Sequence, residues 1–405
     1  MALVVQKYGG TSVGDAERIR AVADHVARTR EAGNDVVVVV SAMGKFTDDL
    51  IRLADDVSPT RPPRELDMLL TAGERISMAL VCMALADRGV GSSSFTGSQA
   101  GIITDTDHTR AKILEMRPDR IREALDAGLV PVVAGFQGVS TERDITTLGR
   151  GGSDVTAVAL AAALKADVCE IYTDVTGVFS ADPRVVSTAR RLSKVSFDEM
   201  MEIAATGGRV LMLRSVEFAR RHGVPLHVRS SFTWEPGTWI VEEDPTMEEA
   251  VVSAVTDDKS EAKVTVGGVP DRPGVAAQLF RELANRGINV DMIVQNTSAK
   301  GMTDISFTVS KTDLDAARET CNQVKNEIGA AEVTSDDSIG RVSIIGAGMK
   351  SSPGVTALMF ETLSENGINI EMISTSSIRI SCVVRAERVD DAVRALHTAF
   401  GLDAA

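Results

Sequence analysis

An internal repeat in the last third of the chain constrains the fold more than any other feature. PGVAAQLFRELANRGINVDMI (273–293) and PGVTALMFETLSENGINIEMI (353–373) lie 80 residues apart and agree at 11 of 21 positions. Each copy follows a β-rich run, starts a helix at Pro and ends it at Gly, and continues into two strands and a second helix. The repeat therefore indicates a tandem duplication of a small β-α-β-β-α domain.

The two copies differ at their ends, and this difference predicts an exchanged strand. The first copy has AAEVTSDDSI (330–339) for a closing strand, whereas the second ends at FGLDAA without one. EEAVVSAVTDD (248–258) precedes the first copy as a strand without a partner. Because an open strand edge is unfavourable, we expect this strand to complete the second sheet. The expected division is a large first domain over 1–246, a first repeat domain over 261–339, and a second over 340–405 completed by 247–260.

The first 245 residues have a different pattern, in which short apolar runs alternate with helical stretches. This alternation predicts an α/β domain with a mostly parallel sheet and helices on both faces. Strands buried on both faces are apolar without polar alternation. Six runs fit that description: LVVQKY (3–8), DVVVVVSAM (35–43), SSFTG (93–97), LVPVVAGF (129–136), DVCEIYTDV (167–175) and VPLHVRS (224–230). Active-site loops are expected at the carboxyl ends of these strands.

Charge and composition narrow the classes of function. A formal charge of −14, without any block of Lys and Arg, argues against nucleic acid as a partner. The four cysteines are scattered in apolar surroundings, with no C-x-x-C pair and no His cluster that would suggest zinc. Because no leader-like N-terminus and no run of 18 apolar residues are present, we expect a cytoplasmic protein with no membrane partner.

The segment KYGGTS, at the end of the first predicted strand, has two interpretations. The backbone N–H groups of Gly9 and Gly10 can approach a phosphate closely, and Lys7 would add a positive charge. The spacing of a P-loop is absent, so an ordinary tight turn remains the alternative.

TTLGRGGSD (146–154) combines three glycines with a following Ala-rich helix that Ser153 or Asp154 can cap. Arg150 has the fork geometry that suits a carboxylate or a phosphate, or it is a solvated side chain at a flexible turn. Asp154 is either a helix cap or a catalytic carboxylate.

Taken together, the motifs KYGGTSV, VVVVSAMG, AGERIS, FTGSQAGI, TTLGRGGSD and YTDVTGVFSADPR and the duplicated tail resemble aspartokinase, in particular the bacterial lysine/threonine-regulated form. The resemblance covers essentially the whole chain, with the motifs in order. It implies an amino-acid-kinase fold, an αβα sandwich, followed by two ACT domains. The implied reaction transfers the γ-phosphoryl group of ATP, with Mg²⁺, to the β-carboxylate of L-aspartate. The product, 4-phospho-L-aspartate, leads to lysine, threonine, methionine and, in many bacteria, diaminopimelate.

The resemblance also implies roles for individual residues. Lys7 would lie against the transferring phosphoryl group, and Asp154 would hold the cationic groups in register, with Arg150 as the third catalytic residue. The aspartate site would consist of Ser41, Thr47, Glu74, Arg150, Gly151, Gly152 and Ser153. The nucleotide site would consist of Lys7, Gly9, Gly10, Thr173, Asp174, Phe179, Asp182, Arg184 and Arg209. At Arg209 the family usually has a lysine, so a planar guanidinium replaces a compact ammonium group. Magnesium would be carried by ATP and not by a dedicated protein site.

The same resemblance implies that the repeats bind an amino-acid effector, which is threonine, lysine or both. The implied effector residues are Asp271, Gly274, Ala276, Asn289, Gln295, Val355, Asn369, Ile370 and Ser376. The alternative is that the repeats serve only dimerisation. Met247 is either a linker residue of a homo-oligomer or the internal start of a small subunit in an α2β2 assembly.

Two other functions remain open on the sequence alone. One is a kinase of the same fold that acts on another small acid, and the other is a catalytically inactive amino-acid sensor. The repeats and TTLGRGGSD argue against the first, and the presence of Lys7, Glu74, Arg150 and Asp154 argues against the second. Because a carboxylate is already a nucleophile at neutral pH, an aspartate kinase needs cations and N–H donors at its site and no general base.

Overall fold

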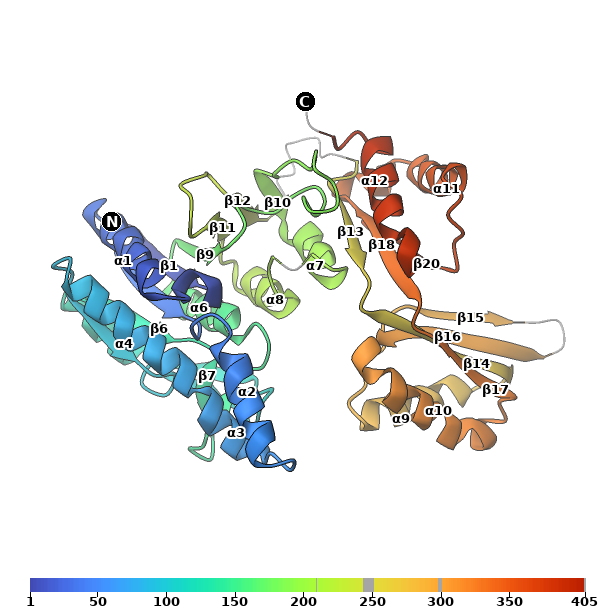
Figure 1. The fold of residues 1–405 in the computed structure, drawn as a ribbon, viewed down its shortest axis with the longest axis horizontal. Coiled ribbons are helices and arrows are strands. Elements are labelled where there is room, and N and C mark those ends of the chain that lie inside the picture. The colour runs from blue at the N-terminus through green and yellow to red at the C-terminus, as the bar shows by residue number, and fades with distance from the viewer. Residues whose placement is uncertain (209, 243–250, 298–300, 404–405) are drawn as a thin grey trace. The chain divides into compact units, whose positions relative to one another are not determined.

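The chain folds into two compact units in the computed structural model (Figure 1). The structure describes all residues except 209, 243–250, 298–300 and 404–405. The first unit comprises Met1–Val178, Arg191–Ala204 and Arg209–Thr246. The second unit comprises Phe179–Arg190, Ala205–Gly208 and Met247–Ala405. A single boundary at residue 246 therefore does not describe the two units, because two short segments of the first half of the chain belong to the second unit.

The first unit is built on an eight-stranded sheet with the order β10-β12-β11-β9-β1-β2-β6-β3. Its strands are β1 (Leu3–Tyr8), β2 (Asp35–Val40), β3 (Ser92–Phe95), β6 (Val130–Ala134), β9 (Val168–Thr173), β10 (Lys194–Ser196), β11 (Leu226–Ser230) and β12 (Thr238–Val241). All neighbouring pairs are parallel except β11 and β12. The six predicted runs are β1, β2, β3, β6, β9 and β11, so the predicted α/β class is confirmed. The sequence did not predict β10 and β12, which are too short to show a period.

Helices cover both faces of this sheet, as the unbroken apolar strands require. The valines of β2 from 36 to 40 are all fully buried, and Val36, Val38 and Val40 pack with helices α1 (Ala16–Glu31) and α4 (Ala72–Ala86). Because side chains alternate along a strand, Val37 and Val39 point to the other face. Helix α6 (Gly152–Leu164) packs against β1, β2 and β9 and against α8 (Leu213–His222). The carboxyl ends of β1, β2, β6 and β9 thus lie along one edge between the helical layers.

A second, smaller sheet of the first unit was not predicted. Its order is β5-β4-β7-β8, and its strands are β4 (Ile102–Thr104), β5 (Ile113–Met116), β7 (Gln137–Ser140) and β8 (Ile145–Thr147). The remaining helices of this part of the chain are α2 (Phe46–Val57), α3 (Pro63–Leu70), α5 (Asp119–Asp126) and α7 (Phe197–Ala205). The stretch Pro63–Ala86 is long and apolar enough to cross a membrane by length and composition. It carries the carboxylates Asp67 and Glu74, and both are buried within the protein.

The second unit contains two similar antiparallel sheets, each covered by two helices (Figure 1). The first domain consists of β14 (Glu261–Pro270), α9 (Val275–Asn285), β15 (Ile293–Thr297), β16 (Met302–Ser310), α10 (Leu314–Ile328) and β17 (Glu332–Asp336). The second consists of β13 (Ala254–Asp258), β18 (Ile339–Ile345), α11 (Val355–Glu365), β19 (Met372–Thr375), β20 (Arg379–Arg385) and α12 (Val389–Ala399). Strand β13 pairs antiparallel with β18, at the edge that corresponds to β17 in the first domain. Strand β13, which precedes the first domain in the sequence, thus completes the sheet of the second domain.

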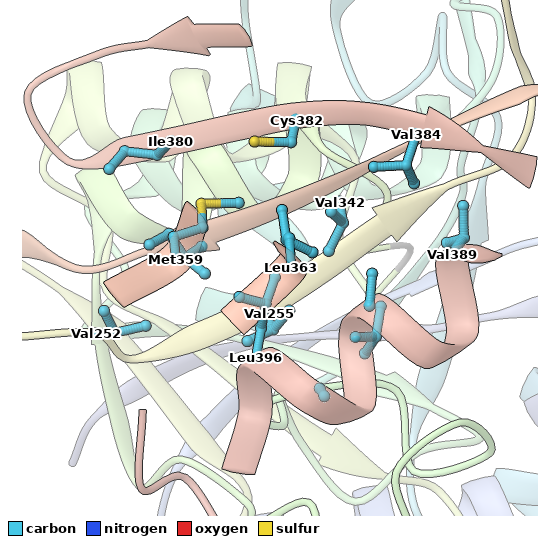
Figure 2. Packing of buried hydrophobic residues seen from close by; sticks show 14 of the residues in the cluster. Val252, Val255, Val342, Met359, Leu363, Ile380, Cys382, Val384, Val389 and Leu396 are labelled. Carbon is cyan, nitrogen blue, oxygen red and sulfur yellow. The ribbon is translucent and has the colours of Figure 1, made fainter. Parts of the chain in front are cut away.

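Strand β13 contributes to the core of the second domain. Figure 2 shows Val255 of β13 among Val342, Leu363 and Leu396, which come from β18, α11 and α12. The Val255 side chain is 1% exposed, whereas Val251, four residues earlier, is 42% exposed.

Val255→Ala should therefore lower the free energy of unfolding of this domain by about 2 kcal/mol, because it removes buried methyl groups and leaves a cavity. Val251→Ala is the matched control, with an expected change below about 0.5 kcal/mol. Urea unfolding of the full chain, followed by circular dichroism, measures both. Equal effects of the two substitutions would contradict a packing role for β13.

Candidate active site

Lys7 and Asp154 form a close ion pair at the edge of the main sheet. Lys7 is near the carboxyl end of β1, and its Nζ lies 2.6 Å from Oδ1 of Asp154 in the first turn of α6. The two side chains are 11% and 10% exposed, so water screens the pair weakly. Because each buried charge depends on the other, the pair fixes the end of β1 against the start of α6. The structure thus brings together two of the three predicted catalytic residues.

The glycine loop before α6 has a left-handed backbone at two positions. Gly149 has φ +75° and Gly151 has φ +71°, a region that residues with a side chain enter at a cost. Gly151 is the N-cap residue of α6, and among the described residues no side chain forms a capping hydrogen bond there. The prediction that Ser153 or Asp154 caps α6 is therefore wrong, because the Asp154 carboxylate is engaged by Lys7. Arg150, between the two left-handed glycines, is exposed.

The two loops after β1 and β2 approach each other through glycines. Gly44 N–H donates to Gly10 O at 2.9 Å, and a Cβ at Gly10 would come within 2.9 Å of Ala42 O. Only glycine allows this approach. Gly9 N–H donates to Tyr172 O of β9 at 3.2 Å. The Gly9 N–H therefore forms a hydrogen bond with β9, contrary to the prediction that it faces a phosphate.

Glu74 is a buried carboxylate with one free oxygen at the start of α4. Its side chain is 3% exposed, and Oε1 accepts a hydrogen bond from Ala42 N at 3.2 Å. Oε2 is buried and has no hydrogen-bond partner within the described part of the chain. Burial raises the pKa of Glu74 to about 7. A buried, unpaired carboxylate oxygen is a suitable acceptor for an ammonium group that comes from outside the chain.

Three further residues of the predicted aspartate site lie at the same edge of the sheet. Ser41 follows β2, and its N–H donates to Tyr8 O at the end of β1 at 3.1 Å. Thr47 is in the first turn of α2. Ser153 packs so closely behind β6 that a Cβ at Gly135 would come within 2.8 Å of its Oγ. The predicted aspartate residues thus come from the end of β2 and from the starts of α2, α4 and α6, beside the ends of β1 and β6.

The predicted nucleotide residues are divided between the two units. Thr173 ends β9 and Asp174 follows it in the first unit, where Thr173 Oγ1 donates to Asp174 Oδ1 at 3.1 Å. The other three, Phe179, Asp182 and Arg184, belong to the second unit, whereas Lys7 belongs to the first. The Asp182 carboxylate accepts from the Arg184 N–H and is paired with its guanidinium at 2.6 Å, which is a local turn contact. Arg209 lies outside the described residues.

The segment Phe179–Arg190 is built into the second repeat domain, which the sequence did not predict. Ala181 and Val186 are members of the core cluster that β13, β18 and α12 form. Ser180 Oγ lies 2.9 Å from His397 Nε2 of α12, and both side chains are fully buried. The only signal in the sequence was a pair of small apolar residues after a turn, which is too common to be specific.

The two repeats face each other with reciprocal ion pairs. Asp291 of the first repeat lies 2.5 Å from Arg341 of the second, and Glu371, the equivalent of Asp291, lies 2.5 Å from Lys263 of the first. Arg341 is 1% exposed and also contacts Glu261 at 2.8 Å. Burial raises the pKa of Glu261 to about 7. The equivalent Met292 and Met372 share one apolar cluster between the domains. The segments that follow α9 and α11 therefore lie next to each other.

The predicted effector residues occupy equivalent places in the two domains. Gly274, with φ +98°, is the N-cap residue of α9, and Val355 begins α11. The others lie beside these helix starts, after the same helices or at strands β15 and β19: Asp271, Ala276, Asn289, Gln295, Asn369, Ile370 and Ser376. Met292 and Met372, which share the apolar cluster between the domains, lie three residues from Gln295 and Asn369 respectively, whereas Asp271 and Gly274 lie at the other end of α9.

Comparison with known protein families agrees with this architecture. The model of the amino acid kinase family matches residues 2–230, and a model of the ACT domain matches residues 264–324 and 342–400. An aspartokinase of Mycolicibacterium smegmatis is 60% identical over 407 aligned positions, covering 99% of this chain and 97% of the relative. An aspartokinase of Corynebacterium glutamicum is 57% identical, and an aspartate kinase of Pseudomonas fluorescens is 53% identical, each over at least 99% of this chain and 97% of the relative.

Solved structures give the same result. The structure of Escherichia coli aspartokinase III in complex with aspartate and ADP, in the R-state, matches with a TM-score of 0.84 and 27% identity. The match covers 98% of this chain and 99% of that one. The T-state of the same enzyme, in complex with lysine and aspartate, matches with a TM-score of 0.76. With the amino acid kinase fold, the duplicated ACT domains and relatives of this identity over its full length, the chain belongs to the aspartokinase family.

Proposed function

We propose that this aspartate kinase binds L-aspartate at the sheet edge formed by β1, β2 and β6 and transfers the γ-phosphoryl group of ATP to its β-carboxylate. The observation that carries the proposal is that the Lys7–Asp154 ion pair, 2.6 Å long, lies at the same sheet edge as Glu74 Oε2, which has no partner in the described part of the chain. One end of the site thus offers a cation for a phosphoryl group, and the other offers an anion for an ammonium group.

The bound substrate would use three groups of the chain. Glu74 would accept its ammonium group, and the Arg150 guanidinium would bind its α-carboxylate in the two-pronged way that this side chain favours. The β-carboxylate would then attack the γ-phosphorus without a general base, because it is already ionised at neutral pH. Lys7 would neutralise the charge on the transferring phosphoryl group, and Asp154 would keep the Lys7 ammonium in place.

The donor set at the site fits Mg²⁺ that arrives with the nucleotide. Mg²⁺ in phosphotransfer sites is commonly held by one or two carboxylates together with phosphate oxygens. Within the described residues no three His, Cys, Asp or Glu side chains are grouped to hold a metal ion. The ion would therefore be carried by ATP, and Asp174, exposed after β9, remains one of the predicted nucleotide residues. Bound Mg²⁺ would supply charge neutralisation between the β- and γ-phosphates.

An ADP-release assay with L-aspartate, ATP and Mg²⁺ tests the proposed reaction. We expect turnover with L-aspartate in the absence of lysine and threonine, and at most trace turnover with L-glutamate, whose extra methylene displaces the reacting carboxylate. The absence of turnover with aspartate would contradict the proposal and favour an inactive sensor. Faster turnover with another acid would favour a different substrate.

The effector that we propose is threonine, lysine or both, bound where the segments after α9 and α11 meet. The pairing of equivalent segments supports this location. We expect at least one of the two amino acids to inhibit the aspartate assay, and the inhibition to be strongest with both if the paired segments hold two sites. An effector acts only through different affinities for two states. Unchanged activity with each amino acid and with the mixture would favour repeats that serve only dimerisation.

The proposed setting is a cytoplasmic oligomer, either a homo-oligomer formed through the ACT domains or an α2β2 assembly. In the second case a small subunit would start at Met247, which lies outside the described residues. Mass spectrometry of protein expressed from the native reading frame distinguishes the two assemblies. A co-purifying chain that begins at Met247 would establish α2β2, and its absence would leave the homo-oligomer.

A further inference from the structure

Asp67 is a buried carboxylate that the reaction described above does not use. It lies in α3 and is fully buried. Its Oδ2 lies 2.6 Å from His108 Nδ1, both of its oxygens accept from Thr109 N at 3.1 Å, and its Oδ1 accepts from Thr147 Oγ1 at 2.5 Å. One carboxylate thus holds three donors, on a loop and on a strand that lie 41 to 80 residues away along the chain.

The loop that Asp67 holds, residues 105–112, has a strained backbone at its centre. Thr109 has φ +69°, a left-handed conformation that a β-branched residue adopts only where its surroundings impose it. The hydrogen bonds from Thr109 N to both Asp67 oxygens are the contacts that fix this peptide. Ala111 N–H also donates to Thr147 O at 2.9 Å, which ties the loop to the end of β8.

The 105–112 loop packs directly against the glycine loop that carries Arg150. A Cβ at Gly149 would come within 3.1 Å of Thr109 O, so the two backbones are in direct contact. Arg214 of α8 joins the two loops, because its guanidinium donates to Leu148 O at 2.7 Å and to Ala111 O at 2.9 Å. The contacts therefore run from Asp67 through Thr109 to Gly149, which is covalently bonded to Arg150.

We propose that Asp67 is a positioning residue of the aspartate site: its carboxylate holds the 105–112 loop against the glycine loop and thereby fixes Arg150. The proposal rests on the assignment of Arg150 to the substrate α-carboxylate. Arg150 is exposed and lies between two left-handed glycines, so its own segment does little to restrict it. The 105–112 loop, packed rigidly on one side, reduces the number of conformations open to Arg150, so substrate binding has less conformational freedom to remove.

Asp67→Asn tests this role, because the amide keeps the shape but places an NH₂ group among donors. We expect KM for L-aspartate to rise about 10-fold to 100-fold, while KM for ATP changes less than 2-fold, since Asp67, Thr109 and Gly149 are not among the predicted nucleotide residues. Arg64→Ala is the matched control, because Arg64 joins the same helix to Asp144, before β8, through an exposed ion pair of 2.8 Å. Its expected change in either KM is less than 2-fold.

A double substitution separates positioning from general damage to the fold. Glycine adopts φ +69° without strain, so Thr109→Gly in the Asp67→Asn background should restore a large part of the aspartate affinity, about 5-fold or more in KM. Thr109→Gly alone should stay within 2-fold of the wild type. No recovery in the double variant, or equal increases in both KM values for Asp67→Asn, would overturn the proposal.

Two further variants test the proposal if Asp67→Asn does not fold and test the role assigned to Arg150. If Asp67→Asn does not fold, Thr147→Val removes one of the three donors at nearly constant volume and should raise KM for aspartate about 3-fold to 10-fold. An unchanged KM would then overturn the proposal. Arg150→Ala tests the assignment on which the proposal rests: an unchanged KM for aspartate in that variant contradicts the site itself. An increase there without one in Asp67→Asn contradicts only the positioning role.

Discussion

Lys7→Ala should lower kcat about 1,000-fold or more while KM for L-aspartate changes less than 10-fold. The reason is that Lys7 is expected to act on the transferring phosphoryl group and not on the bound amino acid. Cationic groups that neutralise this charge contribute factors of about 10³ to 10⁵ in related phosphotransfer reactions. Initial rates at saturating ATP and Mg²⁺, over a range of aspartate concentrations, separate the two parameters.

The ion pair requires a control for stability, because Lys7→Ala leaves the Asp154 carboxylate buried without its partner at 2.6 Å. An unpaired buried charge destabilises a protein by about 3–5 kcal/mol. Lys7→Met combined with Asp154→Asn removes both charges at similar volume, and we expect it to fold as stably as the wild type and to remain inactive. Full turnover by Lys7→Ala, or recovery of activity in the double variant, would contradict the role in charge neutralisation.

Glu74→Gln should make the chain more stable at pH 8 and at the same time raise KM for aspartate about 100-fold. Burial raises the pKa of Glu74 to about 7, above its usual 4.5, so the folded state disfavours the ionised form. Between pH 4.5 and 7 the folded chain holds a proton that the unfolded chain has lost, and this residue therefore makes stability fall as pH rises. Above pH 7 the destabilisation is constant, on the order of 3 kcal/mol. Glutamine removes it.

Ionisation of Glu74 lowers the stability of the chain but should strengthen the binding of aspartate. Only the ionised carboxylate attracts the substrate ammonium group, so KM for aspartate of the wild type should fall as pH rises from 6 to 8. In Glu74→Gln, KM should be high and independent of pH over this range. Glu65→Gln, at an exposed position of α3, is the matched control and should leave both profiles unchanged. A wild-type pH profile retained by Glu74→Gln would assign the titration to another group.

The main strands and the repeats could be predicted from the sequence because their signals are local. Six apolar runs correspond to six strands of the main sheet, since strands buried on both faces are mostly apolar. The small sheet β5-β4-β7-β8 gave no such signal, because strands of three or four residues with polar positions resemble loops. The helix cap was predicted wrongly at Asp154 because propensity favours a side-chain cap, and a long-range partner, Lys7, competed for the same carboxylate.

The sequence by itself determined the family, the duplication and the set of candidate residues, since these depend on motifs and their order. Only the tertiary structure decided how those residues are used. It paired Asp154 with Lys7 and left Glu74 Oε2 without a hydrogen-bond partner among the residues it describes. It also paired the Gly9 N–H with β9 and built Phe179–Arg190 into the second ACT domain. Each of these outcomes depends on contacts between segments far apart in the chain, whose geometry is set by packing and not by local pattern.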